Sequence, residues 1–122
     1  RGWYGGDLAT APDAKWKTPY NKPVIVSEFG GDAKQGLHGD KAERWTEEYQ
    51  QYLYQQNLLM LEKIPNLRGL SPWILMDFRS PRRLLPGVQD GFNRKGLVSD
   101  KGIKKKAFFT LQSFYRTKLQ YK

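Results

Sequence analysis

The stretch that decides the fold is Lys22–Gly30, which reads KPVIVSEFG. Its centre is Val24–Val26, a short apolar run typical of a strand buried on both faces, as in a parallel sheet. We therefore expect a strand over about Pro23–Ser27. Glu28 follows it directly, and an acid in that place is costly unless it is paired or used. The glycines at positions 30 and 31 predict a tight bend or the close approach of a ligand.

A second apolar run covers Leu70–Met76. Because Pro72 has no N–H group, we expect the strand itself to begin near Trp73. Asp77 then follows this strand as Glu28 follows the first. Since the carboxyl ends of parallel strands meet at one edge, the two carboxylates favour acid/base or nucleophilic work on a glycosidic bond. The alternative for Glu28 and for Asp77 is a salt bridge or a capping role at the strand end.

Two helices are expected between and after these strands. Asp40 with Glu43 predicts the start of a helix over about 42–62, which Pro65 ends. Ser99 or Asp100 is the expected cap of a second helix over about 103–118. Their apolar faces comprise Trp45, Tyr49, Tyr52, Leu53, Leu59 and Met60 in the first, and Ala107, Phe108, Leu111, Phe114 and Tyr115 in the second. Lysines 104–106 then lie in the first turn of the second helix, where they oppose the helix dipole.

The order strand, helix, strand, helix predicts an α/β unit in which a parallel sheet is flanked by helices. Two strands do not make a self-sufficient sheet, and handedness places both helices on one side. We therefore expect the chain to be part of something larger, with the remainder of a barrel or a second copy of the chain as its partner.

Composition narrows the class of protein. The chain has 122 residues, 39% of them hydrophobic, and a formal net charge of +9. The basic excess lies after residue 78, which indicates an anionic partner or a solvated basic face. The absence of cysteine excludes a disulfide framework and a cysteine nucleophile. No apolar run reaches the roughly 18–20 residues of a membrane helix, and no helix-turn-helix, zinc-finger or RNA-binding motif is present. We therefore expect neither membrane nor nucleic acid as a partner.

Several segments carry a family resemblance. They are Gly2-Trp3-Tyr4 with Gly6-Asp7-Leu8, Lys22–Gly30, Asp32-Ala33 with Gly36-Leu37-His38, Glu47-Glu48-Tyr49-Gln50, Trp73 with Asp77-Phe78, and Asn93-Arg94-Lys95-Gly96-Leu97. Together they resemble glycoside hydrolase family 2, the family of β-glucuronidases and β-galactosidases, over essentially the whole chain. Lys22–Gly30 is similar to the strand-seven motif of that family. Asn93–Leu97 resembles the Asn-x-Lys-Gly element that β-glucuronidases use on the sugar carboxylate.

The resemblance implies that residues 1–122 form one partial domain, the C-terminal part of a (β/α)8 TIM barrel. This part would hold about strands seven and eight with their helices. The implied reaction is retaining hydrolysis of a terminal β-linked sugar, a glucuronide first and a galactoside second. Glu28 would be the catalytic nucleophile. The implied substrate-binding residues are Tyr4, His38, Trp73, Asn93 and Lys95, of which the last two would bind an acidic group on the sugar.

Some assignments stay open. His38 is equally consistent with a surface-loop histidine. Arg79, Arg82 and Arg83 either add to selection for an acidic sugar or belong to a solvated loop. No cofactor or metal is expected, because the chain has one histidine and its acidic residues show no spacing suited to a cation.

The family's general acid/base is a Glu that follows an Asn near the end of strand four. This chain has no Asn-Glu pair, so we expect that group to lie outside it and the chain alone to be inactive. The alternatives are a non-catalytic carbohydrate-binding or self-associating unit and, with least weight, a basic nucleic-acid binder.

Overall fold

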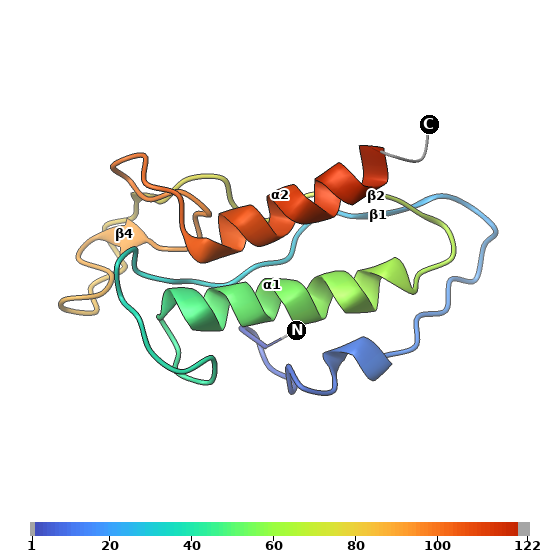
Figure 1. The fold of residues 1–122 in the computed structure, drawn as a ribbon, viewed down its shortest axis with the longest axis horizontal. Helices are drawn as coiled ribbons and strands as arrows, with labels where there is room; N and C mark the ends of the chain where they lie inside the picture. Colours follow the sequence, from blue (N-terminus) through green and yellow to red (C-terminus); the bar gives the residue numbers. More distant parts are fainter. Residues whose placement is uncertain (1, 120–122) are drawn as a thin grey trace.

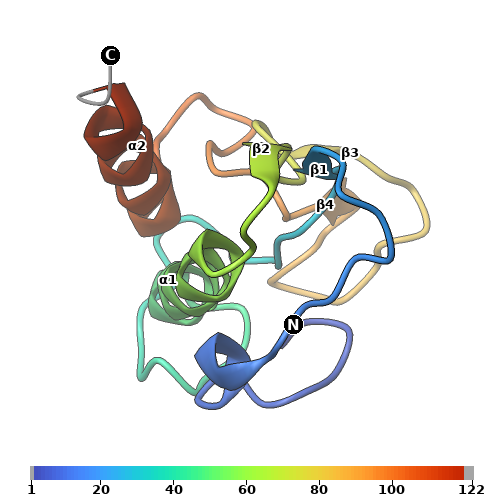
Figure 2. The same cartoon turned by 90° about the vertical axis from the view of Figure 1, so that its right-hand side faces the viewer.

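The computed structural model describes residues 2–119. Its elements, in chain order, are a 3₁₀ turn Ala11–Asp13, β1 Val24–Val26, α1 Glu47–Glu62, β2 Leu67–Leu70, β3 Phe78–Arg79, β4 Phe92–Asn93 and α2 Lys106–Leu119. The two helices lie side by side, and both are on the same side of the β1–β2 pair (Figures 1 and 2). The predicted α/β class and the single-sided placement of the helices are confirmed, whereas the β3–β4 hairpin before α2 is absent from the predicted order.

The β1–β2 pair is parallel, as predicted. Val24 pairs with Leu67 and Val26 with Leu70, with an irregularity between Val24 and Ile25. Each strand has an unpaired edge within the described residues, because the sheet there has two strands. The expected burial on both faces is wrong in this chain: Ile25 points away from the helices and is 70% exposed.

The prediction that the second strand begins near Trp73 is also wrong. The strand lies earlier, at Leu67–Leu70, and ends before Pro72. The chain beyond it pairs with a later segment instead: Leu97 N donates to Ile74 O at 3.0 Å, and Val98 N donates to Leu75 O at 2.9 Å. The apolar run at 70–76 is therefore not one strand. Leu70 belongs to β2, which pairs with β1, whereas Ile74 and Leu75 bond to the segment of Leu97 and Val98.

Helix α1 begins at Glu47, later than predicted. Trp45 has φ 75°, which no α-helix accommodates. Thr46 is then extended, and its side chain accepts a hydrogen bond from Tyr49 N, so Thr46 is the N-cap. Asp40 instead caps a separate turn, in which its carboxylate accepts from Ala42 N at 2.8 Å.

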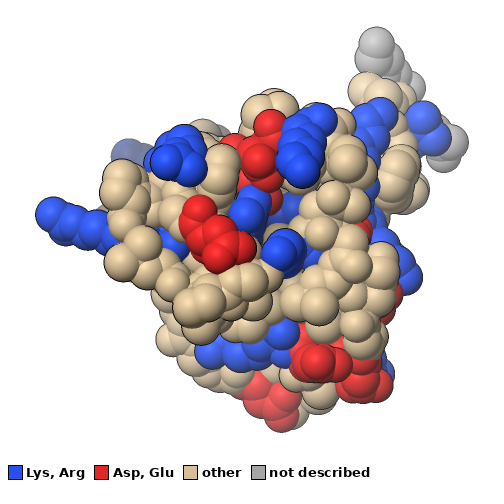
Figure 3. Space-filling model, turned by 90° about the vertical axis from the view of Figure 1, so that its left-hand side faces the viewer, with Lys and Arg blue, Asp and Glu red and all other residues tan. Residues whose placement is uncertain are grey.

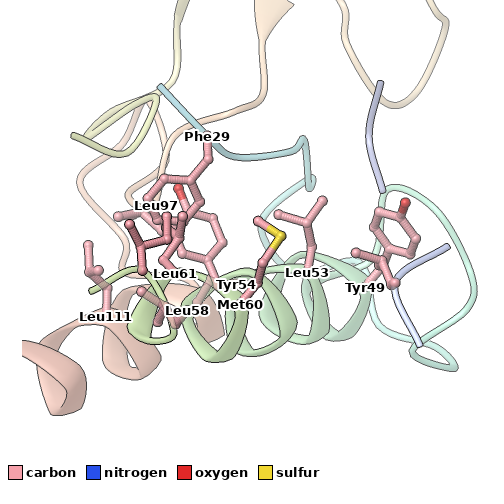
Figure 4. Close-up of a cluster of buried hydrophobic side chains, with 12 residues drawn as sticks. Phe29, Tyr49, Leu53, Tyr54, Leu58, Met60, Leu61, Leu97 and Leu111 are labelled. Atoms are coloured by element: carbon pink, nitrogen blue, oxygen red, sulfur yellow. The ribbon is translucent and has the colours of Figure 1, made fainter. Parts of the chain in front are cut away.

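The face of α1 that packs into the core differs in part from the prediction. Tyr49, Leu53 and Met60 are buried as expected, whereas Leu59 is 49% exposed. The core cluster, most of which is shown in Figure 4, contains Leu8, Phe29, Tyr49, Leu53, Tyr54, Leu58, Met60, Leu61, Ile64, Leu97, Ala107 and Leu111. Helix α1 supplies half of these residues, and α2 supplies Ala107 and Leu111.

Helix α2 begins at Lys106, and neither predicted cap holds it. Ser99 Oγ accepts from Lys101 N and Ile103 N, and Asp100 pairs with Arg94. The first N–H of α2 is instead bound by Glu47 Oε1 of α1 at 2.8 Å. Of its predicted apolar side, Ala107 and Leu111 are buried, Phe108 and Phe114 are half-buried, and Tyr115 is 41% exposed. Neither α1 nor α2 meets the length and apolarity that a membrane span requires, and the described residues hold no other α-helix.

Candidate active site

Glu28 lies two residues beyond β1 and is exposed. Within residues 2–119 its carboxylate has no hydrogen-bond or ion-pair partner. The next residue, Phe29, is buried, and its carbonyl accepts from Trp73 N at 2.8 Å. Trp73 is 39% exposed, and its ring packs edge-on against the Phe78 ring, with 6.3 Å between the two ring centres. The main chain next to Glu28 is therefore bonded directly to the segment that carries Trp73.

Gly30 explains why these two segments can lie so close. A Cβ at Gly30 would collide with the carbonyl oxygen of Trp73 and would lie 3.2 Å from the Tyr54 hydroxyl. The close approach expected here was that of a ligand, and the structure does not show it. The group that approaches in the structure is the Trp73 main chain.

Asn93 is the last residue of β4, and Lys95 lies on the loop that follows it. The β3–β4 hairpin pairs Phe78 with Asn93, and the Asn93 side chain accepts from Lys95 N at 3.0 Å. Both residues are buried, Lys95 to 2% exposure. The Lys95 ammonium lies 2.6 Å from Asp32 Oδ1 and 5.6 Å from the centre of the Tyr4 ring. The structure thus brings Tyr4 and Lys95 together.

Asp77 has the structural role that was the alternative reading. Its side chain is fully buried; Oδ1 accepts from Lys105 Nζ at 2.8 Å and from Gly96 N at 2.9 Å. Arg94 lies 3.5 Å from its other oxygen. Burial raises the pKa of Asp77 and lowers the pKa of Lys105, and the attraction between the two groups opposes both shifts. Asp77 is thus an ion-pair partner, and the acid/base reading for it is wrong.

His38 is bound at the start of α1. Its Nδ1 lies 2.9 Å from Glu48 Oε1 and its Nε2 lies 3.7 Å from Glu47 Oε2. Lys106 also pairs with Glu48, at 2.9 Å. These acidic partners explain the position of the His38 ring, and none of them is a predicted site residue. The side chain is 54% exposed, so it remains open to solvent.

Tyr4, Arg79, Arg82 and Arg83 are exposed. Arg79 stacks its guanidinium over the Phe92 ring at 5.1 Å. Figure 3 shows the end of the molecule where the β3–β4 hairpin lies, and there lysine and arginine side chains alternate with acidic ones. The basic excess therefore does not form one continuous positive surface on this face.

Sequence reasoning missed three residues that support the loop of Asn93 and Lys95. They are Asp32, Arg94 and Lys105, all buried. Lys105 could be noticed in the sequence only as one of three lysines that precede the apolar helical pattern beginning at Ala107. Asp32 and Arg94 had no signal of their own, since only the tertiary fold brings them together. Within residues 2–119 no group of three or more His, Asp or Glu is arranged to hold a metal ion.

The fold corresponds to part of a glycoside hydrolase, as the comparisons with known proteins show. No protein-family model matches the chain, but individual proteins do. The chain is 36% identical to a β-glucuronidase of Streptococcus agalactiae over 107 residues, which are 80% of this chain and 17% of that protein. It is 34% identical to the β-glucuronidase of Homo sapiens over 105 residues, 82% of this chain and 15% of that protein.

A solved β-D-glucuronidase of Dictyoglomus thermophilum matches with a TM-score of 0.77 and 28% identity, over 93% of this chain and 20% of that one. A family-2 β-galacturonidase of Eisenbergiella tayi matches with a TM-score of 0.79 over 96% of this chain and 22% of that one; at 21% identity this likeness concerns the fold alone. The resemblance to glycoside hydrolase family 2 is therefore confirmed. The chain spans 15–17% of the length of the curated relatives described above.

Proposed function

We propose that residues 1–122 are the C-terminal part of the catalytic (β/α)8 barrel of a retaining β-glycosidase, with β1 and β2 as barrel strands seven and eight. Support comes from the parallel pairing of β1 with β2 and from both helices lying on one side of that pair. The unpaired edges of β1 and β2 suit continuation of the sheet by strands outside these residues. The partner of this chain is then the remainder of the barrel.

The proposed substrate is a terminal β-linked glucuronide. The relatives described above are named β-glucuronidases, and the Asn93–Lys95 loop offers an amide and a cation for a sugar carboxylate. A galactoside is the second candidate, and it has no carboxylate for Lys95 to bind. Tyr4, Trp73 and His38 are proposed to contact the sugar from the loops around it.

In the proposed reaction the Glu28 carboxylate attacks the anomeric carbon as the bond to the leaving-group oxygen breaks. A carboxylic acid from outside these residues protonates that oxygen, and a covalent glycosyl ester on Glu28 forms. The same group, now a carboxylate, then takes a proton from water, whose oxygen displaces Glu28 and gives the β-sugar.

The observation that carries this proposal is the state of Glu28. Its carboxylate is exposed and has no partner among the described residues, although the residue after it is buried and bonded to the Trp73 segment. A buried acid needs a partner, as Asp77 has, whereas the exposed Glu28 carboxylate is held by no group within residues 2–119 and is free to meet a ligand. An unpaired carboxylate in a fixed main chain is suited to act on a ligand.

The test is hydrolysis by the full-length protein that contains these residues. With p-nitrophenyl β-glucuronide we expect turnover, with the β-anomer of the sugar as the first product in proton NMR. Glu28→Gln should reduce kcat by about 10⁴-fold or more, because the covalent step is lost. Glu62→Gln, an exposed acid paired with Lys118, is the matched control and should leave kcat unchanged. Activity that survives Glu28→Gln, or an α-anomer as first product, would contradict the proposal. No turnover by the unsubstituted protein would favour a non-catalytic carbohydrate-binding or self-associating role.

A further inference from the structure

The Lys95 ammonium occupies an unusual position for a surface-loop lysine. Its side chain is 3% exposed, and its one ion-pair partner within residues 2–119 is Asp32, at 2.6 Å. Its Nζ also lies 5.3 Å from the centre of the Trp3 ring and 5.6 Å from that of Tyr4. An ammonium has three N–H donors, so donors remain for a further acceptor while the flexible stem is held in place.

Asp32 contacts both the side chain of Lys95 and the main chain that leads to it. Its Oδ1 meets the Lys95 ammonium, and its Oδ2 accepts from Arg94 N at 3.2 Å. The neighbouring Ala33 N donates to Arg94 O at 3.0 Å. Asp32 is fully buried and lies four residues after Glu28. It therefore links the loop of the proposed nucleophile to the loop of the proposed carboxylate-binding residues.

Lys105, which directly precedes α2, reinforces this link. Its ammonium donates to Ala33 O at 2.6 Å and to Arg94 O at 3.0 Å. These are the same two residues that the hydrogen bond from Ala33 N to Arg94 O joins. The cluster contains the buried cations Arg94, Lys95 and Lys105 and the buried carboxylates Asp32 and Asp77, with the exposed carboxylate of Asp100 at its edge. Its formal charges cancel, so the cluster as a whole does not attract an anion; a carboxylate would be recognised by where the donors point.

We infer that Asp32 is a positioning residue that makes the site selective for a sugar carboxylate, by holding the Lys95 ammonium at a fixed place beside Tyr4. This inference rests on the proposed function. It predicts the opposite of simple charge attraction: removing the Asp32 charge raises the net charge of the cluster by one, yet recognition of an acidic sugar becomes worse.

The first readout is kcat/KM of the full-length protein for p-nitrophenyl β-glucuronide and for the β-glucoside, which differ at one carboxylate. Asp32→Asn should lower the glucuronide value by about 10–100-fold, mainly through KM, and change the glucoside value by less than about twofold. Lys95→Met should act alike, and the double variant should lose little more, because both act through one ammonium. Asp100→Asn is the matched control: Asp100 pairs with Arg94 at 2.8 Å and does not touch Lys95, so selectivity should persist.

The second readout does not depend on activity. Acetic anhydride labelling followed by peptide mass spectrometry should show Lys95 protected in the unsubstituted protein and labelled severalfold faster in Asp32→Asn. Unchanged labelling, or a higher glucuronide kcat/KM in Asp32→Asn, overturns the inference. If the unsubstituted protein shows no preference for the glucuronide, the proposed function fails and the selectivity with it, while faster Lys95 labelling still supports Asp32 as the residue that holds Lys95. Should Asp32→Asn not fold, Asp32→Glu keeps the charge but displaces it, and a smaller loss of selectivity is expected.

Discussion

The ammonium of Lys105 lies 2.8 Å from Oδ1 of Asp77, and neither side chain is exposed to solvent. Lys105 directly precedes α2, and Asp77 lies on the segment between β2 and β3. The pair therefore fixes the start of α2 against the end of the molecule where the candidate site lies. A buried ion pair of this kind contributes to stability only as long as both partners are present.

Removing one partner should be costly. Lys105→Met leaves the Asp77 carboxylate buried with the more distant Arg94 as its remaining cation, so we expect a loss of about 3–5 kcal/mol in the free energy of unfolding. The measurement is urea denaturation followed by circular dichroism. Lys106→Met is the control, because the Lys106 side chain is 45% exposed where it pairs with Glu48, and the substitution should cost less than about 1 kcal/mol. Equal losses for the two variants would contradict the structural role assigned to Lys105.

Glu48 predicts a dependence of stability on pH. Burial acts to raise its pKa, but hydrogen bonds from Lys106 and His38 outweigh burial and lower the pKa to about 2, from an ordinary value of 4.5. The folded chain thus binds this proton more weakly than the unfolded chain does. The stabilisation is present above pH 4.5 and is lost as the pH falls toward 2.

The variant that tests this dependence is Glu48→Gln. We expect it to lower the free energy of unfolding by about 1 kcal/mol at pH 7, since water partly screens the group, and to match the unsubstituted chain near pH 2. Urea titrations at several pH values give the difference directly. A constant difference across this range would show that the carboxylate charge is not its source.

The N-cap of α1 allows a test of where the helix starts: at Glu47, as observed, or near residue 42, as predicted from the sequence. Thr46→Ala removes the side-chain acceptor for Tyr49 N, and a loss of about 1 kcal/mol is expected. Asp40→Ala should cost less, because Asp40 caps an exposed turn outside the helix. Thermal unfolding of both variants decides between the two: a larger loss for Asp40→Ala would favour a helix that starts near residue 42.

Gly96 follows Lys95 and lies directly against Asp77. A Cβ there would collide with the main-chain nitrogen of Asp77, so Gly96→Ala should destabilise the chain by about 2–3 kcal/mol. Gly69→Ala in β2 is the matched control, because the nearest atoms to its Cβ would be Ile25 carbons at 3.9 Å. Comparable denaturation midpoints for the two variants would contradict the tight contact of Gly96 with Asp77.

Local sequence signals predicted which helices and strands exist better than they predicted where each one begins and ends. The β-branched run at Val24–Val26 and the three–four spacing after Tyr49 each identified an element correctly. The start of α1 was missed because the Asp40–Glu43 signal is real but belongs to a separate turn. The second strand was misplaced because Leu67–Leu70 contains an arginine and a glycine, and its pairing with β1 outweighs that weak local preference.

The candidate site was also predictable only in part, because some of its residues come together only through tertiary packing. A strand followed by an acid identifies Glu28 from local pattern, and the family resemblance supplies Asn93 and Lys95. Asp32 and Lys105 become part of the site only when segments more than 60 residues apart pack together. The sequence predicts that Lys105 lies in the first turn of a helix, where its charge is unfavourable. In the structure its buried ammonium donates hydrogen bonds to three oxygen atoms, which accounts for its position.

The central claim is that Glu28 forms a covalent bond to an acidic sugar. Its most direct test is intact-mass and peptide mass spectrometry of the full-length protein after incubation with a 2-fluoro-β-glucuronide, which traps the glycosyl intermediate. The account predicts one adduct, located on Glu28, and no adduct in Glu28→Gln. An adduct on another residue would contradict the assignment of Glu28. No adduct with either this reagent or its galactoside counterpart would contradict the glycosidase proposal itself.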